Sequence, residues 1–249
     1  MIKLNTMNKK LLLISNSTMA GEPYLDWCRD VILKFLNDSN IKNVLFFPFA
    51  GVNIDPKSIE ISYNAYESKV QNVFHPFNIK INSIHHYHDY KEAIDQCECI
   101  MVGGGNTFHL LYELHRNNLI EIIRNKVLNG IPYLGWSAGA NLACPTIKTT
   151  NDMPIIFPLS FDALNLIDFQ INPHYLDDNL SNHGGETREQ RIKEFLVVNK
   201  ETKVLGLREG AYLNVYDDKI WLKGQKSARL FNFYSEPIEI NPSDDPIKI

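Results

Sequence analysis

The chain is poor in cysteine, and the few cysteines that it has do not form a recognisable pattern. Only four of the 249 residues are cysteine. Cys97 and Cys99 have no second pair at the spacing of a zinc site, and the other two stand alone. We therefore expect reduced, buried thiols. The sequence also predicts no cofactor.

Long apolar runs and an excess of one charge are also missing. Residues 1–10 are mostly polar, and the apolar run 11–14 is shorter than a signal-peptide core. No stretch approaches the roughly 20 apolar residues of a membrane helix. The 25 basic and 29 acidic residues give a net charge of −4, which does not favour nucleic acid or an anionic membrane as partner. We expect a cytoplasmic monomer or weak homo-oligomer that binds a small molecule or a peptide.

Short apolar runs alternate with segments of helical periodicity, and this pattern predicts an α/β fold. Helices are expected near residues 21–36, 58–73 and 90–96, and strands at 11–15, 43–50, 80–86, 99–102, 133–136, 169–171 and 204–207. Such alternation is typical of a mostly parallel sheet flanked by helices. Residues 212–216, 219–222 and 228–234 predict a C-terminal antiparallel strand region without helices. We expect one domain over residues 1–249, with an N-terminal extension at 1–9 and an irregular tail at 237–249.

The most informative motif is Gly135-Trp136-Ser137-Ala138-Gly139. A Gly-x-Ser-x-Gly segment between a strand and a helix forms a sharp elbow that presents the serine hydroxyl at the edge of the sheet. The start of the helix directs backbone N–H groups and a partial positive charge toward the same point. We predict that Ser137 is a nucleophile and that the N–H of Ala138 binds an oxyanion.

A second glycine-rich turn, Gly103-Gly104-Gly105, also ends a strand and opens a helix. In a parallel sheet both turns lie at the same edge, where ligands bind. We predict that Gly105 supplies the other oxyanion donor. A phosphate cradle is the competing interpretation. It is disfavoured, because the Lys-Ser/Thr end of a P-loop and the Gly-x-Gly-x-x-Gly pattern are both missing.

A serine nucleophile needs a general base, which is nearly always histidine. His174 follows a strand and the stiffening Pro173, so we expect it at the catalytic edge. His183, in a polar loop, is a weaker candidate. The tract 85–88 (HHYH) resembles a metal-binding segment, but metal sites usually draw ligands from separate elements. We interpret that tract as an exposed strand end.

Two carboxylates are candidates for orienting the base. Asp152 follows the elbow helix after a loop, and Glu209 follows a buried strand at the same edge. Turn formation would explain Asp152 equally well, and pairing with a neighbouring arginine would explain Glu209. The residues alone leave both candidates open.

Five blocks in the chain together resemble the S51 family of serine peptidases, which includes α-aspartyl dipeptidases and cyanophycinase. The blocks are residues 103–108 (GGGNTF), 135–141 (GWSAGAN), 149–154 (TTNDMP), 171–174 (INPH) and 185–191 (GETREQR). The resemblance implies a fold like that of class I glutamine amidotransferases, with serine in place of cysteine. It also implies metal-free removal of an N-terminal aspartate from dipeptides and some short peptides. In such an enzyme Ser137 is the nucleophile and His174 the base, while both Asp152 and Glu209 match acids assigned in the family.

Recognition of an aspartyl side chain calls for a cation that forks onto a carboxylate, and arginine has that geometry. We predict that Arg188 takes this role, although its charged surroundings also fit a solvated helix surface. Asn106 and Thr150 are candidates for holding the free amino group or the backbone of the peptide.

Three other functions compete with this interpretation. A cyanophycinase-like β-aspartyl peptidase would share the same motifs. A general esterase is disfavoured by the short spacing between serine and histidine. A non-catalytic binding protein is disfavoured by the complete set of Ser137, His174 and two candidate acids.

Overall fold

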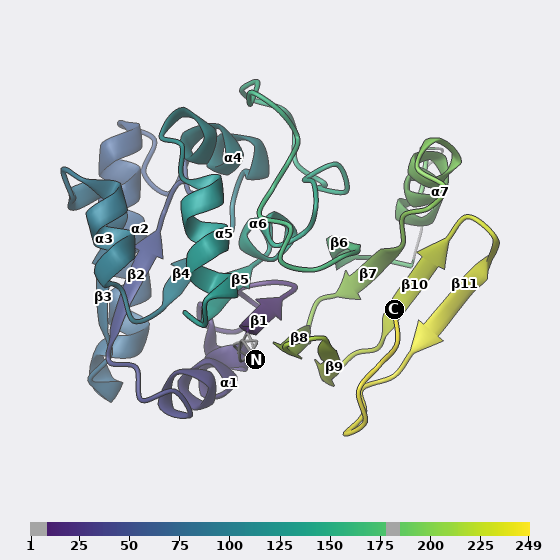
Figure 1. Ribbon diagram of the computed structural model, residues 1–249, viewed down its shortest axis with the longest axis horizontal. Coiled ribbons are helices and arrows are strands. Elements are labelled where there is room, and N and C mark those ends of the chain that lie inside the picture. The colour runs from purple at the N-terminus through teal and green to yellow at the C-terminus, as the bar shows by residue number, and fades with distance from the viewer. Residues whose placement is uncertain (1–8, 178–184) are drawn as a thin grey trace, which may run out of the picture.

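Two β-sheets organise the fold, and the computed structural model describes residues 9–177 and 185–249 (Figure 1). The strands are β1 (Lys10–Ile14), β2 (Asn43–Phe47), β3 (Lys80–Ser83), β4 (Ile100–Val102), β5 (Tyr133–Trp136), β6 (Gln170–Tyr175), β7 (Val204–Arg208), β8 (Ala211–Tyr216), β9 (Lys219–Gly224), β10 (Ala228–Asn232) and β11 (Ser235–Ile240). The helices are α1 (Asp26–Asn37), α2 (Ile59–Phe74), α3 (Tyr90–Gln96), α4 (Thr107–Arg116), α5 (Ile120–Leu128), α6 (Ala138–Leu142) and α7 (Arg188–Val198), with 3₁₀ turns η1 (His75–Phe77) and η2 (Ile84–His86).

The larger sheet has the strand order β3-β2-β4-β5-β1-β8-β9. Its first five strands are parallel, and β8 and β9 add antiparallel strands at one side. The strand interiors are apolar without alternation because both faces are covered. Leu11, Leu12, Leu13 and Ile14 of β1 are all fully buried. The expected mostly parallel sheet flanked by helices is therefore confirmed.

Two apolar cores lie on opposite faces of this sheet. Helices α1 and α2 bury Ile32, Phe35 and Val70 against one face. Helices α3, α4 and α5 cover the other face with residues such as Leu110 and Ile123. Because both faces are packed, the loops at the carboxyl ends of β4 and β5 start from rigid strands.

The smaller sheet has the order β11-β10-β7-β6 and carries α7 on its outer face (Figure 1). We expected the strands near 169–171 and 204–207 in the main sheet, but they pair with each other in this second sheet. Apolar periodicity identifies a strand but does not specify its partner. Strand β8 instead occupies the place beside β1.

The expectation of an irregular tail at 237–249 is wrong for its first part. Residues up to Ile240 continue β11, which pairs with β10 in antiparallel register. Pro237 suggested a break, but β11 is an edge strand, where a residue without an N–H is tolerated. Over the part of the chain that the structure describes, no helix combines the length and apolar character needed to span a bilayer.

Candidate active site

Ser137 occupies the predicted elbow between β5 and α6. Its backbone has φ 53° and ψ −112°, a conformation that is uncommon for a residue with a side chain. The Ser137 N–H donates to the carbonyl of Ile14 over 2.9 Å, which fixes the elbow to β1. A side chain at position 139 would come within 2.3 Å of the Val102 carbonyl oxygen, so only glycine permits this close packing. The elbow thus holds the serine at the carboxyl edge of the larger sheet.

His174 and Glu209 from the smaller sheet complete a relay with Ser137. Nε2 of His174 lies 2.8 Å from Oγ of Ser137, and Nδ1 lies 2.7 Å from Oε1 of Glu209. The tautomer with its proton on Nδ1 satisfies both contacts. The His174 and Glu209 side chains are 38% and 42% exposed, so a substrate can reach the relay.

A β-bulge in β6 places the imidazole. Pro173 pairs with Leu207 and Tyr175 with Arg208, so His174 is skipped in the ladder, and its φ is 52°. A bulge of this kind redirects one side chain out of the strand alternation. Both the serine and the histidine of the relay therefore adopt backbone conformations that only a well-packed frame maintains.

Two small polar residues at the end of β1 join the two sheets beneath the relay. Ser15 Oγ donates to the carbonyl of Leu207 over 2.7 Å and accepts from the N–H of His174 over 3.0 Å. Asn16 Oδ1 accepts from the N–H of Gly210 over 2.9 Å. Both residues are buried. Sequence reasoning missed them, although polar residues directly after a fully apolar strand are the signal that could have found them.

The glycine-rich turn lies directly against the nucleophile. A Cβ atom at position 104 would be 2.9 Å from the Cβ of Ser137. The hydroxyl of Tyr66 on α2 donates to the Gly104 carbonyl over 2.9 Å and accepts from Nε1 of Trp136 over 3.1 Å. Burial raises the pKa of Tyr66 to about 12, so the phenol remains a donor at neutral pH. Sequence reasoning did not single out this tyrosine.

Two backbone N–H groups next to the nucleophile in the chain or in the glycine-rich turn are the candidate oxyanion donors. Gly105 has a φ of +133°, and the turn is fixed by bonds from the N–H of Gly103 to Phe47 and from that of Asn106 to Ala50. Ala138 is the first residue of α6, where a helix leaves its N–H groups without internal partners. Within residues 9–177 and 185–249, no protein acceptor engages the N–H of Gly105 or of Ala138.

The Asp152 carboxylate accepts hydrogen bonds at the N-terminus of α4, whereas Glu209 is the acid that contacts His174. Its Oδ2 accepts from the N–H and the hydroxyl of Thr107 over 2.7 and 2.5 Å, and from the hydroxyl of Thr150 over 3.1 Å. A carboxylate is favourable at a helix N-terminus. Asn106 acts at the same place, since Oδ1 caps α4 at the N–H of His109 and Nδ2 donates to the Met153 carbonyl. These residues fasten the segment after the elbow helix to the glycine-rich turn.

Arg188 lines a cavity of 160 Å³ together with Thr150, Asn151 and Asp152. Its guanidinium donates to Oδ1 of Asn151 over 2.5 Å, and Nδ2 of Asn151 donates to the carbonyl of Pro173, next to His174. Burial lowers the pKa of Arg188 below its ordinary value, and the nearby Asp152 charge opposes that shift. Among the described residues no carboxylate forms an ion pair with this arginine. The cavity therefore offers a half-buried cation.

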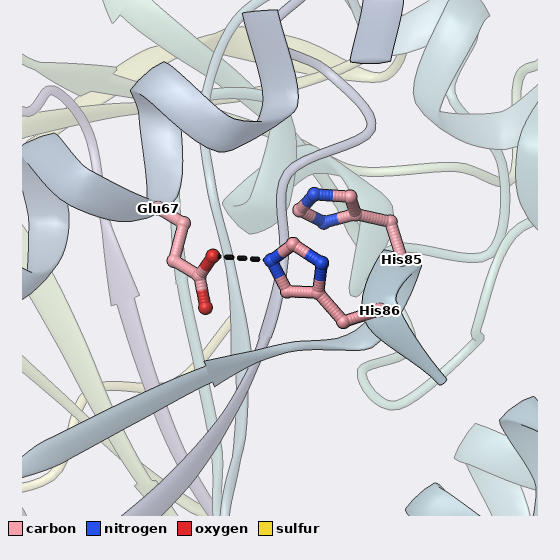
Figure 2. Close-up of side chains that lie close together, drawn as sticks. All are labelled: Glu67, His85 and His86. Carbon is pink, nitrogen blue, oxygen red and sulfur yellow. Dashed lines mark hydrogen bonds and ion pairs between the residues drawn. The ribbon is translucent and has the colours of Figure 1, made fainter. Parts of the chain in front are cut away.

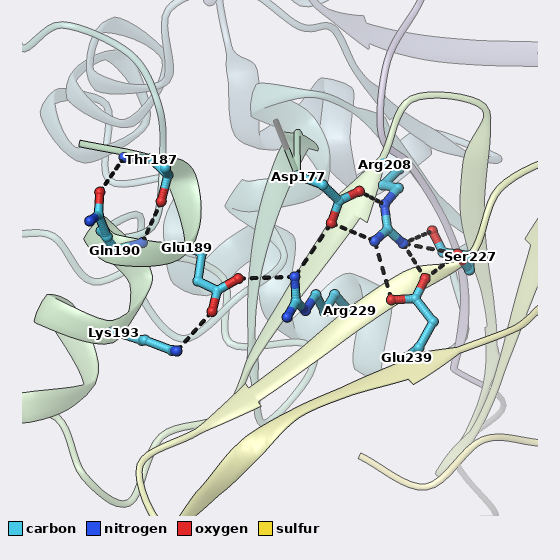
Figure 3. A network of polar contacts seen from close by, with 9 residues as sticks. All are labelled: Asp177, Thr187, Glu189, Gln190, Lys193, Arg208, Ser227, Arg229 and Glu239. Atoms are coloured by element: carbon cyan, nitrogen blue, oxygen red, sulfur yellow. Dashed lines mark hydrogen bonds and ion pairs between the residues drawn. The ribbon is translucent and has the colours of Figure 1, made fainter. Parts of the chain in front are cut away.

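Arg208, which precedes Glu209, is held by carboxylates from two directions (Figure 3). It pairs with Asp177 over 2.6 and 2.7 Å and with Glu239 of β11 over 2.5 and 3.2 Å. These hydrogen bonds raise the pKa of Arg208 above its usual range. The C-terminal strand thus stabilises the end of β7 from which Glu209 projects.

The same network reaches α7. Arg229 of β10 lies 2.9 Å from Oε2 of Glu189 and 3.6 Å from Oδ1 of Asp177 (Figure 3). Glu189 is adjacent to Arg188, so the network connects the strand of the relay acid with the helix of the candidate substrate cation.

The described histidines outside the relay make other contacts. His109 is buried and its Nδ1 contacts the carbonyl of Phe49 over 2.8 Å, a structural contact. His183 lies outside the described residues. His85 and His86 lie beside Glu67 in a group that could hold a metal ion, and this group lies next to the edge strand β3, three strands from β5.

Together the fold and these contacts define an α/β protein with a hydroxyl–imidazole–carboxylate relay at the carboxyl edge of its central sheet. Residues 11–223 match peptidase family S51, and the chain belongs to this family of peptidases. Peptidase E of Nostoc sp. is 50% identical over 96% of both chains. Peptidase E of Shewanella amazonensis is 44% identical over 90% of this chain and 92% of its own. The crystal structure of a peptidase from an acI-B1 actinobacterium shares the fold, with a TM-score of 0.69, 15% identity and 98% of each chain covered.

Proposed function

We propose that this peptidase is a cytoplasmic serine-type dipeptidase that removes an N-terminal aspartate from dipeptides and some short peptides. One observation carries the proposal: Nε2 of His174 is 2.8 Å from the hydroxyl of Ser137, and its Nδ1 is 2.7 Å from Glu209. The resemblance to α-aspartyl dipeptidases and the relatives named Peptidase E support the substrate class.

The relay supports an acyl-enzyme mechanism. His174 accepts the Ser137 proton as Oγ attacks the carbonyl carbon that follows aspartate, and Glu209 stabilises the resulting imidazolium. The N–H groups of Gly105 and Ala138 bind the oxyanion, each contributing about 3 kcal/mol. The imidazolium then gives its proton to the leaving amine, and an ester to Ser137 remains. Water activated by His174 attacks that ester and releases aspartate.

Arg188 is proposed to bind the aspartyl carboxylate. Its half-burial argues against a purely solvated surface role, and a cavity beside it gives the carboxylate a place. Thr150 lines the same cavity and is proposed to contact the peptide. Both ends of the Asn106 amide are engaged by the protein, so we assign it the support of the neighbouring loop.

Substitution of the nucleophile tests the proposal directly. Ser137→Ala is expected to abolish hydrolysis of Asp-Leu and labelling by a fluorophosphonate, because the members of such a relay act as a unit. Ser160→Ala, the same change in a surface loop, serves as control and should behave as wild type. Circular dichroism would verify that both variants are folded. Undiminished turnover by Ser137→Ala would refute the proposal.

Hydrolysis of a panel of peptides that differ in linkage and in the first residue distinguishes the proposed activity from its closest alternatives. We expect hydrolysis of α-Asp-Leu and little of β-Asp-Leu or Asn-Leu. Preference for the β-linked peptide would instead indicate a cyanophycinase-like activity. An unreactive Ser137 with no hydrolysis of any peptide would indicate a non-catalytic binding protein.

A further inference from the structure

Three potential metal ligands converge at an edge of the protein that the relay does not use. Glu67 belongs to α2, while His85 and His86 form the 3₁₀ turn η2 after β3 (Figure 2). One ligand atom from each residue lies within 4.8 Å of the others. Strand β3 is the edge strand, three places from the β5 strand that leads to Ser137. The group is therefore separate from the candidate active site.

One residue, Ser83, orients two of the three side chains. Its backbone N–H donates to Oε1 of Glu67 over 2.9 Å, which leaves Oε2 directed at Nε2 of His86, 2.7 Å away. The Ser83 hydroxyl lies 2.6 Å from Nδ1 of His85. Hydrogen bonds that fix the carboxylate and the second ring nitrogen are a regular feature of metal-binding side chains.

The two histidines are already close to each other. Their ring centroids are 3.9 Å apart, and the rings are inclined by 38°. Nε2 of His85 contacts Oδ1 of Asn64 over 2.9 Å. Coordination by His85 would replace one of its two present contacts and keep the other as the bond that orients the ring.

The donor set specifies the kind of ion. Two imidazoles and one carboxylate favour Zn²⁺ and related divalent transition metals, whereas Ca²⁺ and Mg²⁺ prefer oxygen ligands alone. The sequence did not show a further ligand from a separate element for the histidine tract. In the structure Glu67 of α2 lies beside it and is such a ligand. The His86 side chain is 51% exposed, which gives an ion access and leaves room for water as a fourth ligand.

We propose that Glu67, His85 and His86 form a binding site for a Zn²⁺-class ion. The ion replaces the hydrogen bond between Glu67 and His86, and rotation of these side chains brings the donors to bond lengths of about 2.0–2.2 Å. Any proton on the coordinating nitrogens passes to solvent. The ion connects α2 to the end of β3. Since α2 also carries Tyr66, which bonds to Gly104, the site stabilises the helix that supports the glycine-rich turn.

Calorimetric titration of the metal-free, full-length protein with ZnCl₂ tests the site. The His174→Ala variant provides the background, because it removes the relay as a competing zinc site. We expect one ion per chain in this background. Adding Glu67→Gln or His86→Ala should weaken binding by at least 10- to 100-fold, because that is already the usual loss when only a partner that orients a ligand is removed. Adding His88→Ala, a change at a neighbouring histidine outside the group, should leave the affinity unchanged.

Two further measurements make the outcome decisive. Glu67→Gln retains an oxygen that can accept from the Ser83 N–H, so this variant should lose the metal ligand without losing the fold. Equal melting temperatures of the variant and the background without metal would verify that the fold is kept. Co²⁺ bound at the site should give visible absorption that both ligand variants lose. Zinc binding of equal strength in Glu67→Gln, His86→Ala and the background would overturn the proposal, as would no binding at micromolar zinc.

Discussion

The two halves of the candidate active site are held in place by different kinds of contact. Ser137 and the glycine-rich turn belong to the larger sheet, where the supporting groups are buried. Tyr66 is 2% exposed and bonds to both Gly104 and Trp136. The nucleophile therefore takes its position from core packing and from uncharged hydrogen bonds.

The smaller sheet supplies the imidazole and the acid, and α7 beside it supplies the candidate substrate cation. Besides the buried contact of Ser15 with His174, charged groups support this half. Arg208 joins Asp177 and Glu239, while Arg229 joins Glu189, all near the surface (Figure 3). Partly exposed ion pairs are weaker than buried contacts and respond to salt. The comparison predicts that the contacts around the smaller sheet respond to salt, whereas those that hold the nucleophile do not.

The largest expected effect comes from comparing the two candidate acids, Glu209 beside the smaller sheet and Asp152 at the N-terminus of α4. Glu209→Gln keeps the shape of the side chain but favours the wrong imidazole tautomer, so we expect kcat to fall on the order of 10³- to 10⁴-fold. Asp152→Asn removes a charge from the N-terminus of α4, and we expect about 1 kcal/mol lower stability with a smaller loss of kcat. Steady-state kinetics and melting temperatures measure both effects.

Each acid variant is the control of the other. If Asp152→Asn lost more activity than Glu209→Gln at an unchanged melting temperature, the assignment of Glu209 would fail. Asp152 would then have a catalytic role in addition to its contacts with the N-terminus of α4.

A second test concerns the substrate cation of the smaller sheet. Hydrogen bonds to charged groups contribute about 1.5–3 kcal/mol, so Arg188→Met should lower kcat/KM for Asp-Leu about 10- to 100-fold. The preference for Asp-Leu over Asn-Leu should shrink as well. Arg191→Met changes a second arginine of the same cavity, which already lies near Glu186, and it should have a smaller effect. Equal losses for both peptides would contradict a role of Arg188 in recognising the carboxylate.

Local signals in the sequence were sufficient for the nucleophile side. The elbow at Ser137 was predictable because a strand, a glycine-flanked serine and a helix follow one another within ten residues. The position of His174 was predicted for a similar reason, since Pro173 marks the end of a strand. The bulge that directs its ring was not visible, because it depends on pairing with β7.

Features that depend on contacts between distant segments could not be predicted. Asp152 and Glu209 both stand in loops after strands or helices, and only the meeting of β6 with β7 brings one of them to Nδ1 of His174. Asn151 is a polar residue of ordinary type in a loop, and only its contacts with Arg188 and the Pro173 carbonyl give it importance. The second sheet was not predicted because the sequence of a strand does not specify which strand pairs with it.

The last test compares one uncharged support of the nucleophile with one charged support of the smaller sheet. Tyr66→Phe leaves the buried Trp136 N–H and the Gly104 carbonyl without their partner, at a cost of about 1–3 kcal/mol that salt should not change. Arg208→Met removes an ion-pair network, and we expect about 1 kcal/mol lower stability and a few-fold lower kcat/KM.

Measurements at low salt and at about 1 M NaCl, where the Debye length is about 3 Å, distinguish the two variants. Screening weakens the pairs of Arg208 in the wild type, so the gap between wild type and Arg208→Met should narrow at high salt. The gap between wild type and Tyr66→Phe should persist, because its cost is desolvation of uncharged groups. Identical salt responses of the two variants would show that charge does not hold the smaller sheet in place, and the contrast between the halves would then rest on burial alone.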